Sequence, residues 1–295
     1  MPPVNRILDV RAAFAILALF TLVACFVCLG CSSREASSTL SPPVGKGKGS
    51  PGSSGTGQAL TPGGAAPEVT DPLVLLRFPR AGPDGKDLLP EGWEPYQFKK
   101  VPRQTIYDVV IENGAPALRA RSESAASAVR RRVGIDPSRY PCIEWEWKID
   151  HPIEGANCLS KEGDDCAARL MILYRYDPAS ASFPERVKFN AAKSLEGEYP
   201  PSAMLVYAWT EEEDRGQILT SPYSDRVKLI PLERGAMRAG AWVTERRNHF
   251  EDFELAFGRV PPEIEWVAFL VDTDDTKSKD TAWLKALRFL PPAPR

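Results

Sequence analysis

The chain has 295 residues, and its 37 Lys and Arg residues nearly balance its 39 Asp and Glu residues, giving a formal net charge of −2. This balance, without a concentrated stripe of Lys and Arg, is not that of a nucleic-acid-binding protein, so we expect no nucleic acid as a partner. The chain also lacks a strand–helix alternation and a glycine-rich phosphate loop, which excludes a Rossmann or P-loop domain.

The N-terminus has the pattern of a bacterial lipoprotein signal. Arg6 and Arg11 accompany an uncharged, mostly apolar stretch over 12–30, and the sequence turns polar directly after Cys31. We predict a signal peptide over 1–30 and a lipidated Cys31, with Cys25 as the alternative acylated residue. An uncleaved anchor over 12–30 is a further alternative, because this stretch approaches the length of a membrane-spanning helix. Each version ties the protein to a membrane and predicts a location in the cell envelope. If the organism is Gram-negative, this location is the outer membrane or the periplasmic face.

A long polar segment follows the signal. Residues 32–70 are mostly Ser, Gly, Pro, Thr and Ala, with no aromatic residue. Such a segment buries too little apolar surface to offset its ordering entropy, so 31–70 is predicted to be a lipidated cysteine followed by a flexible linker. The pattern becomes globular near Pro72, and 71–295 is long enough for one large β domain.

Short apolar or alternating runs, typical of β-strands, recur through this domain. The Asn-Gly pair at 113–114 separates two of them and predicts a β-hairpin. In a later run, apolar and charged residues alternate over 143–149, which predicts a strand with one buried face. The predicted strands lie at 73–78, 92–98, 107–112, 116–120, 143–149, 167–176, 203–210, 226–232, 264–271 and 283–290.

One segment has helical spacing instead. Phe250, Phe253 and Phe257 recur at intervals of three and four residues. A helix is therefore predicted from Thr244, as its N-cap, to about Phe257, with Gly258 at its C-terminal end. About ten strands and this one short helix predict a mostly β fold, a jelly-roll-like β-sandwich.

Three cysteines remain in the domain. Cys158 and Cys166 bracket a polar loop, and in an exported protein we predict that they form a disulfide. Cys142 lies at the start of an apolar strand and is predicted to be a buried thiol.

An acidic loop directly precedes the predicted strand at 167–176. Asp164 and Asp165 are adjacent, and Arg169 follows them within the strand. Neighbouring carboxylates at a strand entrance can bind a cation or hold sugar hydroxyls, which makes these three residues candidate ligand-binding residues. The alternative is a solvated turn with one Asp–Arg pair.

A second acidic loop follows the apolar run at 264–271. Asp272, Asp274 and Asp275 repel each other unless a cation or an arginine lies near, so this loop is a candidate Ca²⁺ site. It lacks the glycine and the distal glutamate of an EF-hand. A structural turn, in which Asp and Thr side chains bond to the local backbone, is equally open.

A third polar segment contains Arg247, Asn248 and Asp252. An arginine fork recognises carboxylates through two hydrogen bonds, so the segment is a candidate binding site. The alternative is a helix start with ordinary pairing between residues four apart.

Aromatic residues could serve a sugar site or the core. Trp145 and Trp147 share a strand face with Ile143 and Ile149, which favours core packing over a stacking platform for sugar rings. The same interpretation applies to the aromatic pair within 207–209.

Several of these motifs together resemble the domain-of-unknown-function 3047 family of bacterial exported proteins. The resemblance covers roughly residues 75–290 and implies a shared fold, without implying a reaction. The cysteine pair and the long linker are departures from the family pattern. The motifs, in chain order, are Trp145-x-Trp147-Lys148, Gly163-Asp164-Asp165-x-Ala167-x-Arg169, Tyr207-Ala208-Trp209, Glu245-x-Arg247-Asn248 with Asp252 and Phe257-Gly258, and Asp272-Thr273-Asp274-x-Thr276.

From these candidates we predict a membrane-tethered envelope lipoprotein whose β-sandwich binds a carbohydrate or another envelope polymer, with Ca²⁺ as the candidate cofactor. The first alternative is a polysaccharide hydrolase or lyase in which Asp165, Arg247 and Asp272 are catalytic. The second is a non-catalytic domain in which the charged residues form buried ion pairs. The first two functions require the three charged segments to meet in one site.

Overall fold

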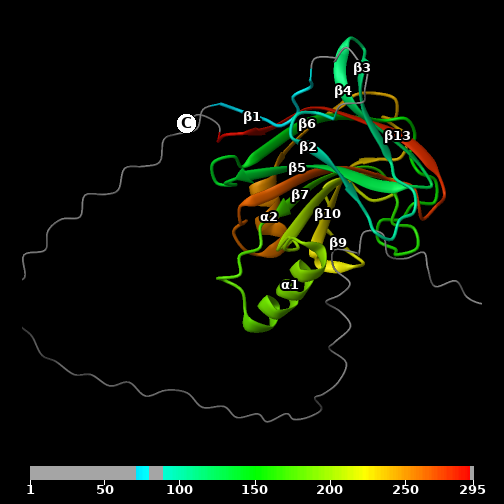
Figure 1. Ribbon diagram of the computed structural model, residues 1–295. Coiled ribbons are helices and arrows are strands. Elements are labelled where there is room, and N and C mark those ends of the chain that lie inside the picture. Colours follow the sequence, from blue (N-terminus) through cyan, green and yellow to red (C-terminus); the bar gives the residue numbers. More distant parts are fainter. Residues whose placement is uncertain (1–70, 80–88, 293–295) are drawn as a thin grey trace, which may run out of the picture.

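A computed structural model describes residues 71–79 and 89–292 of the chain. These residues form two β-sheets and two helices (Figure 1). Because the two sheets enclose one apolar core, the prediction of a mostly β, jelly-roll-like sandwich is confirmed. The predicted signal peptide, both candidate acylation sites and the predicted linker lie outside the described residues.

The first sheet has six strands in the order β11-β6-β13-β4-β3, with β1 also paired to β13. Its strands are β1 (Leu73–Val74), β3 (Ile106–Glu112), β4 (Ala115–Glu123), β6 (Cys142–Ile149), β11 (Val243–Asn248) and β13 (Lys279–Leu290). The second sheet has seven strands in the order β2-β5-β12-β7-β8-β10-β9. Its strands are β2 (Trp93–Gln97), β5 (Ala126–Ile135), β7 (Cys166–Tyr174), β8 (Ala203–Thr210), β9 (Leu219–Ser221), β10 (Ser224–Arg234) and β12 (Ile264–Asp272). Neighbouring strands are antiparallel, apart from the parallel pair of β8 and β10.

The hairpin predicted from the Asn-Gly pair is present between β3 and β4. Asn113 and Gly114 both have positive φ angles, of 52° and 81°. A two-residue turn of this kind matches the right-handed twist of the flanking strands, and Gly and Asn tolerate positive φ best. The local sequence therefore determines the register of this hairpin.

Aromatic side chains fill the space between the sheets. Trp145 and Trp147 are completely buried on β6, and they meet Tyr207 and Trp209 of β8 from the opposite sheet. The ring centroids of Trp145 and Tyr207 are 5.3 Å apart, and those of Trp147 and Trp209 are 5.9 Å apart. These four residues are core residues, as the alternating pattern favoured, and they are not exposed sugar platforms.

The helix predicted from Thr244 begins later than expected. Residues from Val243 to Asn248 form β11, which pairs with β6 at the edge of the six-stranded sheet. Helix α2 (His249–Phe257) starts after Asn248, whose side chain accepts a hydrogen bond from a first-turn backbone N–H. Its C-terminal end at Gly258 is as predicted. The polar segment before α2 satisfies its backbone groups by strand pairing, and this overrides the capping potential of Thr244.

The prediction of a single helix is wrong, because α1 (Phe183–Glu196) forms a second one. Ser182 caps its N-terminus, and Gly197 ends it with a φ of 86°. Only Phe189 and Ala192 are buried, so the helix lacks the broad apolar stripe by which an amphipathic helix is recognised. Within the described ranges, no helix is long and apolar enough to cross a membrane.

Candidate functional site

Two of the predicted polar segments meet at one end of the seven-stranded sheet. β12 ends at Asp272, which pairs in register with Cys166 at the start of β7. This antiparallel pairing places the loop before β7 beside the loop after β12. We call the charged residues gathered there the acidic cluster: Asp164, Asp165, Arg169, Asp272, Asp274 and Asp275.

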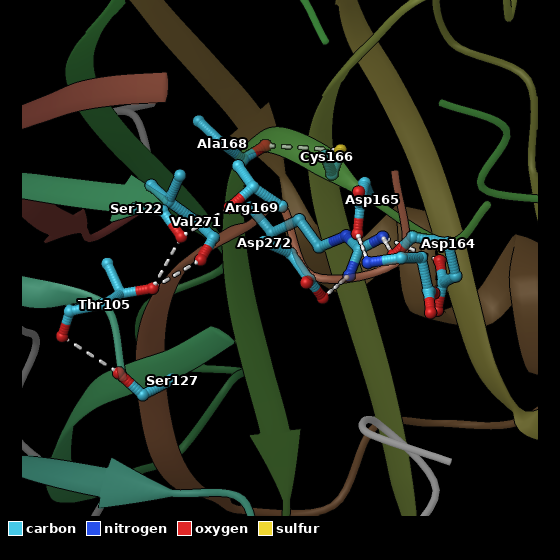
Figure 2. A network of polar contacts seen from close by, with 12 residues as sticks. Thr105, Ser122, Ser127, Asp164, Asp165, Cys166, Ala168, Arg169, Val271 and Asp272 are labelled. Carbon is cyan, nitrogen blue, oxygen red and sulfur yellow. Dashed lines mark hydrogen bonds and ion pairs between the residues drawn. The ribbon is translucent and has the colours of Figure 1, made fainter. Parts of the chain in front are cut away.

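Arg169 lies at the centre of the acidic cluster and is 2% exposed. Its Nη2 donates to Oδ1 of Asp164 at 2.6 Å, and its Nη1 donates to Oδ2 of Asp272 at 3.3 Å. Figure 2 shows the guanidinium group lying between these two carboxylates. Such buried, charge-assisted hydrogen bonds are strong, but they only compensate for removing the charges from water.

Asp165 holds the second loop in place and is 1% exposed. Its Oδ1 accepts from the backbone N–H of Asp275 at 3.1 Å, and its Oδ2 accepts from the backbone N–H of Thr276 at 2.7 Å. The hydroxyl of Thr276 donates to the same oxygen. One carboxylate from the first loop thus satisfies three donors of the second, which joins segments about a hundred residues apart in sequence.

Buried hydroxyl groups fix the other side of the second loop. Ser122 Oγ lies 2.9 Å from Thr273 Oγ1, and Thr105 Oγ1 lies 3.0 Å from Ser122 Oγ. Thr105 also donates to the carbonyl of Val271 at 3.0 Å (Figure 2). The backbone on both sides of Asp272 is therefore anchored to β4, to the residue that precedes β3 and to the loop before β7.

The charges of the acidic cluster are incompletely compensated. Among the described residues, Oδ1 of Asp272, Oδ1 of Asp274 and Nε of Arg169 are buried without a hydrogen-bond partner. Burial raises the pKa of Asp164 to about 6 and that of Asp275 to about 7. Burial also raises the pKa of Asp272 well above its ordinary value, although the Arg169 guanidinium opposes this shift. The ionised carboxylates here lack part of the solvation or pairing that they require.

The third predicted segment lies elsewhere. Arg247 Nε donates to Asp252 Oδ2 at 3.0 Å, and the hydroxyl of Tyr207 donates to the same oxygen at 2.8 Å. Asp252 belongs to the first turn of α2, and His249 of the same helix is 3.3 Å from the hydroxyl of Tyr174. Tyr174 is the last residue of β7, whereas the acidic cluster lies at the first residue of this strand. The nine residues of β7 therefore separate the Arg247 segment from the acidic cluster by roughly 27 Å.

The structure thus brings together the first and second predicted segments and leaves the third apart. Asn248 caps α2, and Arg247 and Asp252 form a local pair. The proposed catalytic set of Asp165, Arg247 and Asp272 is not assembled in one place. The Arg169 pairs instead match the buried ion pairs of the structural alternative.

The predicted disulfide is absent, since Cys158 and Cys166 are both buried free thiols. The Sγ of Cys166 donates to the backbone carbonyl of Trp209 at 3.0 Å, so this thiol has a partner on β8. Burial raises the pKa of Cys166 to about 11 and also raises that of Cys158, which keeps both in the unreactive thiol form. Cys142 is a free thiol as well and is half-buried, less than predicted.

Sequence reasoning missed a groove on the outer face of the seven-stranded sheet, the face turned away from the six-stranded sheet. Every residue of β7 and β8 is buried, and most side chains on both faces of these strands are apolar. We call this surface the outer groove. Its floor includes Met171, Leu173, Met204, Ala268 and Leu270, and its rim includes Tyr96, Phe98, Arg130, Glu198 and Trp266.

The rim of the outer groove combines aromatic rings with charged groups. The Arg130 guanidinium carbon lies 3.8 Å from the centroid of the Trp266 ring and 4.5 Å from that of the Tyr96 ring. Arg130 Nη1 donates to Oε1 of Glu198 at 2.5 Å. These contacts hold the rim side chains in fixed positions, and such preorganisation lowers the cost of binding a ligand.

The outer groove and the acidic cluster share the same two strands. Arg169, Met171 and Leu173 alternate along β7 and therefore point to one face of the sheet. Leu270 pairs in register with Arg169, and Asp272 follows it on β12. One available signal was the nearly continuous apolar run of 264–271, because in a two-layer fold only one face of such a strand contacts the other sheet.

Comparison with known proteins gives few matches in sequence and several in structure. No curated protein matches the chain. Similar solved structures include a mutant of a family 29 carbohydrate-binding module, at 10% identity and a TM-score of 0.31, covering 75% of this chain and 91% of that one. A family 30 carbohydrate-binding module from a Clostridium thermocellum cellulase has 12% identity and a TM-score of 0.33, covering 76% and 95%. An endoglucanase from Rhodothermus marinus has 11% identity and a TM-score of 0.34, covering 63% and 88%.

Likenesses at these identities and TM-scores give the chain no functional assignment.

A stronger match is to the family described as "Protein of unknown function (DUF3047)", over residues 91–288. That range includes both loops of the acidic cluster and the residues of the outer groove, and it confirms the resemblance predicted from the motifs. The chain belongs to the DUF3047 family.

Proposed function

We propose that this protein is a lipid-anchored protein of the cell envelope whose β-sandwich binds a neutral carbohydrate chain in the outer groove. The proposal rests on one observation, the apolar outer face of the seven-stranded sheet with its aromatic and charged rim. Sugar rings have apolar C–H faces and a periphery of hydroxyl groups. A site that combines rings with carboxylate and guanidinium groups can contact both.

The polar groups of the rim suit hydroxyl groups. The carboxylates of Glu198 and Glu265 can accept hydrogen bonds from sugar hydroxyls, and the guanidinium of Arg130 can donate to them. The acidic cluster lies beyond the apolar floor, on the same face as Met171 and Leu173. Negative charge at the end of the groove would repel a polyanion, so a neutral glycan is the favoured ligand.

The N-terminal segment would determine where this binding occurs. A lipid on Cys31 would hold the chain at a membrane. A flexible linker of about 40 residues has a root-mean-square reach of roughly 35 Å. A domain held in this way could bind polymers at some distance from the membrane surface.

The groove proposal predicts that Trp266→Ala weakens glycan binding about tenfold, which corresponds to about 1.4 kcal/mol. The substitution removes the largest ring of the rim and the stacking partner of Arg130. Binding is measured for the full-length protein in detergent micelles, by affinity gel electrophoresis and by calorimetry with neutral glucans, mannans and xylans. Polygalacturonate serves as an anionic comparison and is expected to bind more weakly.

Trp283→Ala is the matched control, because Trp283 is half-buried on the six-stranded sheet and contacts Lys148 in a similar way. It should leave glycan affinity unchanged. The proposal fails if no neutral glycan binds, or if the two tryptophan variants lose affinity equally.

The anchor proposal predicts that Cys31→Ala abolishes incorporation of labelled palmitate. Only the acylated cysteine carries the lipid, so Cys25→Ala should be labelled like the unaltered protein. Labelling followed by membrane fractionation measures both variants. Loss of label from Cys25→Ala alone would move the acylation site to Cys25, and label in the double variant would exclude both sites.

The geometry favours binding over hydrolysis. Asp165 and Asp272 are each 1% exposed, and both engage protein partners. Arg247, the remaining member of the proposed catalytic set, lies beside α2. A substrate in the outer groove would meet the rim and floor residues before it reached these carboxylates.

A further inference from the structure

Three carboxylates of the acidic cluster converge on one point. Each of Asp165, Asp272 and Asp274 offers an oxygen, and these oxygens lie within 4.8 Å of one another. Asp165 comes from the loop before β7, whereas Asp272 and Asp274 come from the end of β12 and the loop after it. We propose that these three residues bind one calcium ion, a site independent of the proposed glycan binding.

Unpartnered buried oxygens show that this site can accept a further ligand. Asp272 is 1% exposed, and its Oδ2 accepts from Arg169 while its Oδ1 has no partner. Oδ1 of Asp274 is likewise buried and unpartnered. Buried carboxylate oxygens are nearly always satisfied in folded proteins, because leaving one unpaired costs more than a typical hydrogen bond returns. A cation between the carboxylates would satisfy both oxygens at once.

The excess of carboxylates over positive groups in the acidic cluster also favours a bound cation. The guanidinium of Arg169 is shared between Asp164 and Asp272. The nearby Lys277 directs its Nζ to the backbone carbonyl of Asp274 and not to its carboxylate. A single arginine cannot neutralise this many carboxylates, and a divalent ion would supply the remaining positive charge where the oxygens are closest.

The donor set favours calcium over other metals. All three donors are carboxylate oxygens, which hard cations prefer, and none is a nitrogen or sulfur atom. Calcium binds oxygens at 2.3–2.6 Å in flexible geometry, so it can bridge oxygens that lie up to about 5 Å apart. Magnesium needs distances of about 2.0–2.1 Å and near-octahedral order, which would require these anchored loops to move closer together.

The protein's own hydrogen bonds hold most of this site in place. Asp165 is fixed by three donors of the Asp275–Thr276 segment, and Thr273 is fixed by Ser122. Binding therefore requires little ordering of the backbone. The calcium ion would clamp the loop after β12 to the start of β7, and the expected effect is on stability.

The test uses the full-length protein in detergent micelles, stripped with EDTA and returned to chelator-free buffer. Calorimetric titration with CaCl₂ should show one site per chain, with a Kd on the order of 10⁻⁴ M, as in other extracellular calcium modules. At a free calcium concentration of 100 times Kd, the folding equilibrium constant should rise about 100-fold, seen as an increased Tm. MgCl₂ at the same concentration should shift the Tm less.

Asp274→Asn is the informative variant, because Asp274 is only half-buried and its replacement is the least disruptive to folding. Its calcium affinity should fall at least tenfold, while its circular dichroism spectrum stays unchanged. Asp214→Asn is the matched control, since Asp214 is exposed and pairs with Arg234 at the surface. The proposal is overturned if titration of the unaltered protein with CaCl₂ releases or absorbs no heat of binding and leaves the Tm unchanged. It is also overturned if Asp274→Asn binds calcium with unchanged affinity.

Discussion

Replacing Arg169 with methionine should lower the free energy of unfolding by about 3–5 kcal/mol. Methionine is also an unbranched side chain and fills much of the same space, but it has no hydrogen-bond donor. Asp164 and Asp272 would then lie buried next to other carboxylates, without the guanidinium that pairs with both. Removing one partner of a buried ion pair costs more than the pair contributes, since the remaining charge is left uncompensated.

Urea-induced unfolding at neutral pH, with EDTA present to exclude bound cations, measures this difference. Arg234→Met is the matched control, because the Arg234–Asp214 pair is exposed on both sides. Exposed pairs contribute about 0–1 kcal/mol, so the control should lie close to the unaltered protein. If the unfolding free energy of Arg169→Met also lies within 1 kcal/mol of that of the unaltered protein, the buried ion pairs of Arg169 do not stabilise the fold.

The second large effect concerns Asp280, a buried carboxyl group at the same end of the fold as the acidic cluster. Burial raises its pKa to about 7, whereas an unfolded chain has a value of about 3.9. Its Oδ1 accepts from the backbone N–H of His151 at 3.3 Å, and its Oδ2 has no partner. The His151 ring lies 3.8 Å away and opposes the shift, whereas the negative charge of Asp150 adds to it. The wall of the adjoining cavity also carries Arg103, Arg121, Glu123 and Lys279.

The sign of the effect follows from proton binding. Between about pH 4 and pH 7 the folded state keeps a proton on Asp280 that the unfolded state has lost, so stability falls as pH rises through this window. Asp280→Asn removes the ionisation and should stabilise the protein at pH 8 by up to about 4 kcal/mol, from 1.36 kcal/mol per pKa unit. At pH 4 the two proteins should differ little, since an amide resembles the protonated acid.

Thermal melts of both proteins between pH 4 and pH 8 test this expectation. Asp214→Asn is the control, because Asp214 is exposed and pairs with Arg234 rather than with Asp280, so its replacement should leave the slope of stability against pH unchanged. Equal pH profiles for Asp280→Asn and the unaltered protein would show that Asp280 ionises normally in the folded state.

Patterns local in sequence predicted the fold well. Alternation on β6 placed Trp145 and Trp147 in the core, and the Asn-Gly pair gave a hairpin with the correct strands. Both signals depend on neighbouring residues and need no knowledge of the topology. Helix α1 was missed because only two of its side chains are buried, so its evidence was confined to its caps.

The site depended on distant pairing and was predicted only in part. Asp165 and Asp272 come together because β7 and β12 are neighbours, a fact that no local pattern contains. Arg247 resembles the other candidates in composition but lies on β11, in the opposite sheet and at the other end of the sandwich. The outer groove was missed because its residues come from several strands, each of which has an ordinary apolar pattern.

The outermost strands of the two sheets differ in how easily they could pair with another molecule. β9 has only three residues, β2 carries Pro95, which cannot donate a backbone hydrogen bond, and β11 is rich in charged side chains. All three features discourage intermolecular strand addition. β3 has seven residues and exposes Ile106 and Ile111 at its ends. Self-association of the folded domain through strand pairing would therefore begin at β3.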